Sequence, residues 1–117
     1  MRHRKGNKKL GKPTDQRIAL LRSLLVAFFS HDSIKTTDTR AKAVKRLAEK
    51  LITYGKTGTL HSRRLALQLL PNSIVVKRVF SEVAPKYQDR QGGYTRLTKI
   101  GTRQGDAAMI SLLELVD

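Results

Sequence analysis

The sequence predicts an α+β domain of two layers, in which helices pack on one face of a small three-stranded sheet. Three observations lead to this class. Apolar residues recur at helical spacing in four segments between residues 15 and 84, a short β-branched segment interrupts them at 32–37, and two alternating segments follow at 94–100 and 108–116. The expected order of elements is α-β-α-α-α-β-β, which one domain of 117 residues can hold.

The first thirteen residues differ in character from the rest of the chain. Residues 1–13 combine many cations with two glycines and one proline and show no apolar periodicity, so we expect an extended basic N-terminal arm. A single globular domain is then expected over residues 14–117. Thr14 is a suitable cap for a helix over 15–30. The apolar side chains of that helix form a wide arc, which predicts burial on more than one side: Ile18, Leu21, Leu25 and Phe28.

The segment 32–37, which reads DSIKTT, is short and β-branched and is expected to form a strand. A second helix over 38–54 should follow, capped by Thr37 or Asp38. Its apolar stripe leaves an opposite face that carries Lys42, Lys45, Arg46 and Lys50. Gly55 is expected to end this helix, since glycine is the usual residue just past a helix C-terminus.

Two further helices are expected in the middle of the chain. The third spans 60–70, with Thr59 as its cap. The fourth covers 74–84, capped by Asn72 or Ser73, and its valines fit helical spacing. Because β-branched residues also favour strands, a strand remains the alternative for this fourth segment.

The C-terminal quarter has the pattern of a hairpin. Residues 85–93 are rich in polar residues and glycine and are expected to form a loop. The segment 94–100 alternates like a strand, Gly101 and Gly105 bracket a turn, and 108–116 returns as a more apolar strand. The stronger apolar character of 108–116 predicts a central or well-covered position in the sheet.

Charge is the strongest functional signal in the composition. Lys and Arg number 24 against nine Asp and Glu, which gives a net charge of +15 and an isoelectric point near 10.9. Such an excess destabilises a compact monomer by self-repulsion unless a polyanion neutralises it. Nucleic acid is the foremost partner on this criterion, before anionic membranes and acidic proteins. Cysteine is absent, which excludes disulfides, cysteine zinc sites and thiol catalysis.

The segments that resemble catalytic, metal-binding or targeting motifs are better explained otherwise. The apolar stretch 18–29 is interrupted by an arginine and is too short to span a bilayer, so it is interpreted as a core helix. The GKT at 55–57 has Lys50 where a P-loop needs glycine. The histidines have no metal-ligand spacing. We therefore expect no enzymatic activity, no cofactor, no metal, no small-molecule substrate and no membrane partner.

Cations occur on several different kinds of element, which indicates contacts with a folded RNA that is recognised by its shape. No helix-turn-helix, zinc finger or basic zipper is visible, and Tyr94 is the aromatic residue available for stacking on the C-terminal strands. A non-specific architectural DNA-binding protein remains the alternative. The candidate RNA contacts are Arg2, His3, Arg4, Lys5, Lys8, Lys9, Lys12, Arg17, Lys35, Lys42, Arg46, Arg63, Arg64, Arg90, Tyr94, Arg96, Lys99 and Arg103.

Several dispersed motifs resemble one known family. The opening MRHRK, IKTTDTRAKAVKRLAEKLITYGK at 34–56, HSRRLA at 61–66 and GGYTRLTKIGTRQGDAAMISLLELVD at 92–117 are similar, in this order, to the L-seventeen family of bacterial large-subunit ribosomal proteins. The resemblance covers essentially the whole chain.

This resemblance implies a structural component of the large ribosomal subunit, in the cytoplasm, that binds 23S rRNA near the polypeptide exit region. It also implies neighbouring large-subunit ribosomal proteins as partners, and a two-layer α/β fold with a small three-stranded mixed sheet and no cofactor. The family motifs place rRNA contacts in the basic start, at Arg2, His3, Arg4 and Lys5, and in the GGYTR segment that begins at Gly92.

Overall fold

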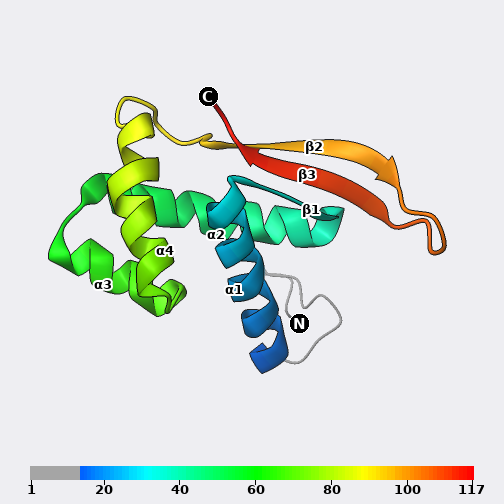
Figure 1. The fold of residues 1–117 in the computed structure, drawn as a ribbon, viewed down its shortest axis with the longest axis horizontal. Coiled ribbons are helices and arrows are strands. Elements are labelled where there is room, and N and C mark those ends of the chain that lie inside the picture. Colours follow the sequence, from blue (N-terminus) through cyan, green and yellow to red (C-terminus); the bar gives the residue numbers. More distant parts are fainter. Residues whose placement is uncertain (1–13) are drawn as a thin grey trace, which may run out of the picture.

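A computed structural model describes residues 14–117 of the chain (Figure 1). The element order is α1 (Thr14–His31), β1 (Ser33–Thr37), α2 (Asp38–Thr57), α3 (Leu60–Leu69), α4 (Ser73–Arg78), the π-helical turn η2 (Val79–Val83), the 3₁₀ turn η3 (Ala84–Tyr87), β2 (Thr95–Thr102) and β3 (Met109–Leu115). Helix α2 lies along the sheet, α1 crosses α2, and α3 and α4 lie at the far end of α2 (Figure 1). The predicted α+β class is confirmed.

The sheet has the strand order β1-β3-β2, so the C-terminal strand is central, as its apolar character predicted. Leu113 of β3 faces Ile34 on one neighbour and Leu97 on the other. Both pairings are antiparallel, so the expectation of a mixed sheet is wrong. The direction of β1 could not be inferred locally, because the long helical connection from β1 to β2 can return the chain at either end of the sheet.

The core is aliphatic and aromatic and is centred where α1, α2 and the sheet meet. Leu25, Phe28 and Phe29 of α1 are fully buried, and Leu51 of α2 and Leu113 of β3 belong to the same cluster. The two phenylalanine rings lie edge to face, with centroids 5.0 Å apart.

The N-terminal half of α1 differs from this core. Helix α1 begins at Thr14, so this residue lies in the first turn and not before it as a cap. Ile18 is 41% exposed, and the prediction of burial on more than one side is therefore wrong for this half of the helix. The cause is tertiary: the buried residues of α1 are confined to its second half, where it packs on the rest of the fold.

Helix α2 runs three residues beyond its predicted end. It ends at Thr57 and is followed by Gly58, whose φ of 70° is left-handed and whose N–H donates to the Tyr54 carbonyl. The prediction that Gly55 stops the helix is wrong. Gly55 lies inside α2 at a close approach to the next layer, where an added Cβ would be 2.8 Å from the Cβ of Ala84.

Replacing Gly55 with alanine should lower the free energy of unfolding by about 1–2 kcal/mol. Alanine gains about 1 kcal/mol of helix propensity over glycine, but a new contact at 2.8 Å with another Cβ has no flexible end to move aside. Urea unfolding measures the change, and Ala84→Gly in the Gly55→Ala background should recover most of it. A Gly55→Ala protein more stable than the parent would show that the two helices separate without cost.

The central helices begin at the predicted caps. The Thr59 hydroxyl accepts from the Ser62 N–H, and the Asn72 side chain accepts from the Val75 N–H. The segment 74–84 is helical, which decides between the two readings left open by its valines. It continues as the turns η2 and η3, so the first residues of the predicted loop 85–93 are helical as well.

The hairpin of β2 and β3 is confirmed and projects beyond the helices (Figure 1). Strand β2 continues through Gly101, with an irregularity in register between Lys99 and Gly101. The reversal therefore lies further along the chain, where the Ala107 N–H donates to the Arg103 carbonyl. No helix within residues 14–117 is long and apolar enough to cross a membrane.

Candidate nucleic-acid interface

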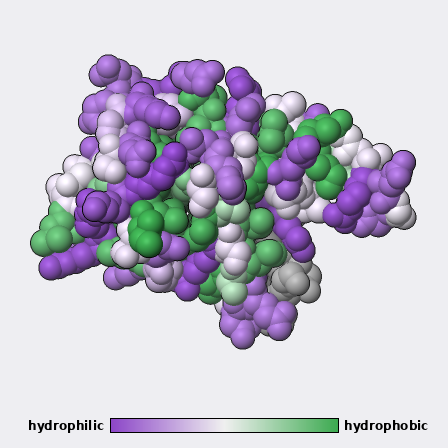
Figure 2. Space-filling view, viewed as in Figure 1, coloured by the Kyte–Doolittle hydropathy of each residue, from purple (hydrophilic) through white to green (hydrophobic). Residues whose placement is uncertain are grey.

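Hydrophilic residues cover most of the face shown in Figure 2, with smaller hydrophobic areas between them. The predicted contacts in the arm lie outside the described residues: Arg2, His3, Arg4, Lys5, Lys8, Lys9 and Lys12. Most of the other predicted contacts fall on three surfaces: a groove between α1 and α2, the sheet and its hairpin, and helix α3. Arg90 is instead exposed in the loop between η3 and β2, and Tyr94 directly precedes β2. Each of these surfaces has its own geometry.

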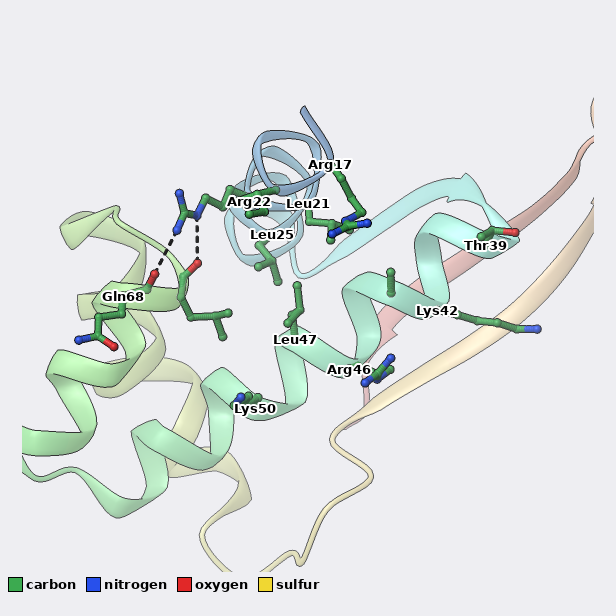
Figure 3. A pocket seen from close by; sticks show the side chains of 13 residues that line it. Arg17, Leu21, Arg22, Leu25, Thr39, Lys42, Arg46, Leu47, Lys50 and Gln68 are labelled. Carbon is green, nitrogen blue, oxygen red and sulfur yellow. Dashed lines mark hydrogen bonds between the residues drawn. The ribbon is translucent and has the colours of Figure 1, made fainter. Parts of the chain in front are cut away.

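The hollow between α1 and α2, called the α1–α2 groove below, has a volume of about 640 Å³. Its cations come from both helices: Arg17 and Arg22 from α1, and Lys42, Arg46 and Lys50 from α2 (Figure 3). No acidic residue is found among the described residues that line it. Three of the predicted contacts therefore line the groove together with Arg22 and Lys50: Arg17, Lys42 and Arg46.

The spacing along α2 brings three of these cations together, whereas Arg22 has a different role. Lys42, Arg46 and Lys50 follow one another at intervals of four residues, so they lie one above another on one face of α2. Arg22 was not among the predicted contacts, because it interrupts an apolar stretch. Its guanidinium donates to the carbonyls of Gln68 at 3.1 Å and Leu69 at 3.2 Å (Figure 3). Arg22 therefore ties α1 to the end of α3.

The first turn of α2 is fixed to the sheet through Asp38. The Ser111 hydroxyl of β3 donates to Asp38 at 2.7 Å, and the Lys42 ammonium lies 3.1 Å from the same carboxylate. The hydrogen bond from Ser111, followed by the one from Lys42, lowers the pKa of Asp38. This arrangement orients the α2 cations relative to the sheet.

Lys45 has a structural role that the helical pattern did not show. Its ammonium donates to the Glu49 carboxylate at 3.0 Å and to the Thr95 hydroxyl at 2.9 Å, and that hydroxyl donates to Glu49 at 2.8 Å. Partial burial raises the pKa of Glu49, but the hydrogen bonds from Thr95 and Lys45 outweigh it and leave this pKa below its ordinary value. The network joins α2 to the start of β2.

Glu49→Gln should lower the free energy of unfolding by about 1 kcal/mol at pH 7. The pKa of Glu49 is lower in the folded state, so its stabilising contribution is present at neutral pH and is lost as the pH falls through that folded pKa. The difference between parent and variant should therefore shrink towards pH 3 in urea unfolding. Glu82→Gln is the control, since Glu82 is 65% exposed and 3.9 Å from Arg78. Equal effects of the two substitutions at pH 7 would contradict the network.

Tyr94, one of the predicted RNA contacts, does not expose its ring as a surface on which a base could stack. Its side chain is buried, with 3% of the residue exposed, and its ring lies 5.4 Å from the ring of Tyr87. The Lys56 ammonium donates to the Tyr94 hydroxyl at 3.0 Å, which lowers the pKa of Tyr94, and Lys56 also donates to the Arg90 carbonyl. Tyr94 and Lys56 thus hold the loop before β2 against α2.

The sheet places its cations on both faces. Ser111 and Leu113 are buried towards α2, so by the alternation of side chains Lys35 and Arg96 lie on the opposite face, which no described helix covers. Arg96 is paired with Glu114 at 3.0 Å. Lys35 is exposed. Lys35 is the stronger candidate contact on this face.

The remaining predicted contacts are dispersed. Lys99 is exposed opposite Ser111, and Arg103 pairs with Asp106 at 2.6 Å in the hairpin turn. The hydrogen bond from Arg103 lowers the pKa of Asp106 to about 2, so this pair stays ionised at neutral pH. On α3, the Arg63 guanidinium lies 4.6 Å from the centroid of the Phe80 ring. Arg64 is exposed on the same helix.

No cluster of three or more potential metal ligands occurs within residues 14–117. The GKT at 55–57 lies at the end of α2 and not after a strand, so it is not a P-loop. The hydroxyl–carboxylate pairs Ser111–Asp38 and Thr95–Glu49 join α2 to the sheet, and both hydroxyls belong to buried residues. What the arrangement can do chemically is hold negative charge, above all along the α1–α2 groove.

These features describe a small basic α+β domain whose surface suits a polyanion. The family described as ribosomal protein L17 matches residues 20–116. Large ribosomal subunit protein bL17 of Clostridium acetobutylicum is 56% identical over 111 residues, which cover 95% of this chain and 97% of the relative. The proteins of the same description from Clostridium botulinum and a Thermoanaerobacter species are each 53% identical, over 95% of this chain and 98% and 99% of the relative.

The chain belongs to the ribosomal protein L17 family. It is therefore a structural protein of the large ribosomal subunit and not an enzyme. Its place is on the bacterial ribosome, in the cytoplasm. The resemblance inferred from the dispersed motifs is confirmed.

Proposed function

We propose that the protein binds 23S rRNA near the polypeptide exit region, through its basic arm and its basic surfaces, and that it supports assembly of the large subunit and translation. Neighbouring large-subunit proteins are its further partners. The observation that carries the proposal is the α1–α2 groove, where five cations from two helices meet without an acidic residue among the described lining residues. Membership of a large-subunit protein family supports RNA as the polyanion.

The electrostatics of the groove support the same conclusion. Like charges on facing helices repel one another at separations within the Debye length, which is about 8 Å at physiological salt. The repulsion lowers the stability of the isolated protein, and phosphates placed between the cations remove it. Each phosphate contact should contribute about 0.7–0.9 to the magnitude of the slope of log affinity against log salt.

Competition between protein-free 23S rRNA and duplex DNA for the full-length protein tests the proposal. At a fixed salt concentration the rRNA should be bound more tightly, and the protein should cosediment with large subunits and leave them only at high salt. Equal affinity for the two nucleic acids would favour a non-specific DNA-binding protein and overturn the proposal. Cross-linking within isolated subunits tests the location, and cross-links only to proteins remote from the exit region would contradict it.

A further inference from the structure

We propose that the α1–α2 groove receives one unpaired nucleotide of the rRNA, with its base against an apolar floor and its flanking phosphates on a cationic rim. The inference rests on the proposed function and specifies what one part of the surface recognises. It is carried by two properties that occur together in the groove, an apolar floor that is partly open to solvent and a cationic rim.

The floor of the groove is aliphatic. Ile18, Leu21 and Leu25 lie on one face of α1, and Leu47 of α2 points towards Leu25 (Figure 3). Ile18 is 41% exposed, so part of this floor is open to solvent. Contacts with the backbone of a duplex need cations but no apolar hollow. An unpaired base has two apolar faces and leaves water when it packs on aliphatic side chains and guanidinium planes.

The rim of the groove is cationic on both sides. Each of Lys42, Arg46 and Lys50 lies about 6 Å further along the axis of α2 than the one before, because four residues rise about 1.5 Å each. Arg17 lies across from them on α1 (Figure 3). Arg22 is held by the two carbonyls at the end of α3, so little side-chain entropy is lost when an anion approaches it. Successive phosphates on either side of an inserted nucleotide would meet this rim.

The charge of the groove decides among possible occupants. Residues 1–13 of the same chain contain six Lys and Arg and no acidic residue, so the rim repels them. RNA brings one negative charge per nucleotide and is the main polyanion of the particle to which this family belongs. An acidic segment of another protein has the same sign of charge as RNA, and the experiment below distinguishes it.

Two RNA hairpins of equal length test the inference, one fully paired and one with a single unpaired nucleotide, the latter made with each of the four bases. The full-length protein should bind at least one of the latter about tenfold more tightly than the paired hairpin, a gain of the size expected when one face of a base and part of an aliphatic side chain leave water. Ile18→Asn should abolish this preference, so that the variant binds the unpaired and the fully paired hairpins about equally. Thermal unfolding should show both proteins folded at the assay temperature, because Ile18 is partly exposed.

Ile74→Asn is the matched control, since Ile74 lies on α4 and is 81% exposed. It should keep the preference. Equal affinity of the parent for all hairpins, or equal effects of Ile18→Asn and Ile74→Asn, would overturn the inference. If 23S rRNA were still preferred over duplex DNA in that case, the proposed function would stand without it. If the parent protein bound 23S rRNA no more tightly than duplex DNA, the proposed function itself would be overturned.

Photo-cross-linking locates the nucleotide directly. With 4-thiouridine at the unpaired position, irradiation should join the RNA to peptides from α1 and α2, within 14–31 and 38–57. Cross-links confined to the sheet would overturn the inference. So would a polyglutamate peptide that removes the preference for the unpaired nucleotide without displacing the paired hairpin, because the groove would then be assigned to an acidic protein segment.

Discussion

A chain that lacks residues 1–12 should bind 23S rRNA with a salt slope about 4–5 units smaller in magnitude than the full-length protein. The segment contains six Lys and Arg, and each one that contacts a phosphate contributes about 0.7–0.9 to the slope. At low salt the loss of affinity should be several orders of magnitude, and the difference should narrow as salt rises. Filter binding at a series of salt concentrations measures both quantities.

The matched control for this truncation is a full-length chain in which the same six cations are replaced by glutamine. It keeps the length of the segment and removes its charge, so it should lose the same slope. Thermal unfolding of both proteins should resemble that of the parent, because the described core lies within residues 25–113. A truncated chain that fails to fold would show that the first residues belong to the core.

Much of the fold could be predicted because local chemistry determines it. The periods of the apolar residues located all four helices and the three strands, and the oxygen-bearing caps Thr59 and Asn72 marked helix starts that the structure confirms. The apolar run at 108–116 identified the central strand, because a strand flanked on both sides buries more of its surface than an edge strand does.

The errors arise where tertiary contacts override local signals. Gly55 has the chemistry of a helix end, but its small size is used for the approach to Ala84. Ile18 has the position of a core residue, but it lies in the α1–α2 groove and is 41% exposed. The expectation of a mixed sheet was wrong in the same way, because the register and orientation of β1 depend on partners distant in the chain.

The candidate interface was predictable in sign but not in detail. Charge and its spread over many elements indicated a polyanion, and the interval of four residues on α2 indicated one basic helix face. Periodicity could not show that Lys45 is engaged by Glu49 and Thr95. It also could not show that Tyr94 is buried against Lys56 and Tyr87, because both facts depend on where β2 crosses α2. The groove itself forms only where α1 packs across α2, and this packing is a tertiary contact that periodicity does not predict.

Phe28→Ala should lower the free energy of unfolding by about 3–5 kcal/mol. Phe28 is fully buried and its ring packs edge to face on Phe29, so the substitution leaves a cavity where α1 meets the core. The total stability of a domain is about 5–15 kcal/mol, so this one change removes a large share of it. Urea unfolding measures the loss, and Ile74→Ala, at a residue that is 81% exposed, should change stability by less than about 0.5 kcal/mol.

The same variant separates stability from binding. Phe28 does not line the α1–α2 groove, so the cations of α1 and α2 keep their positions as long as the protein is folded. At a temperature well below its unfolding midpoint, Phe28→Ala should therefore bind 23S rRNA with the salt slope of the parent. Bound rRNA should also raise the midpoint of the variant, since a ligand of the folded state stabilises it by mass action. A stability loss below about 1 kcal/mol would show that the core closes over the missing ring, and a changed slope in the folded variant would show that the packing of α1 sets the geometry of the groove.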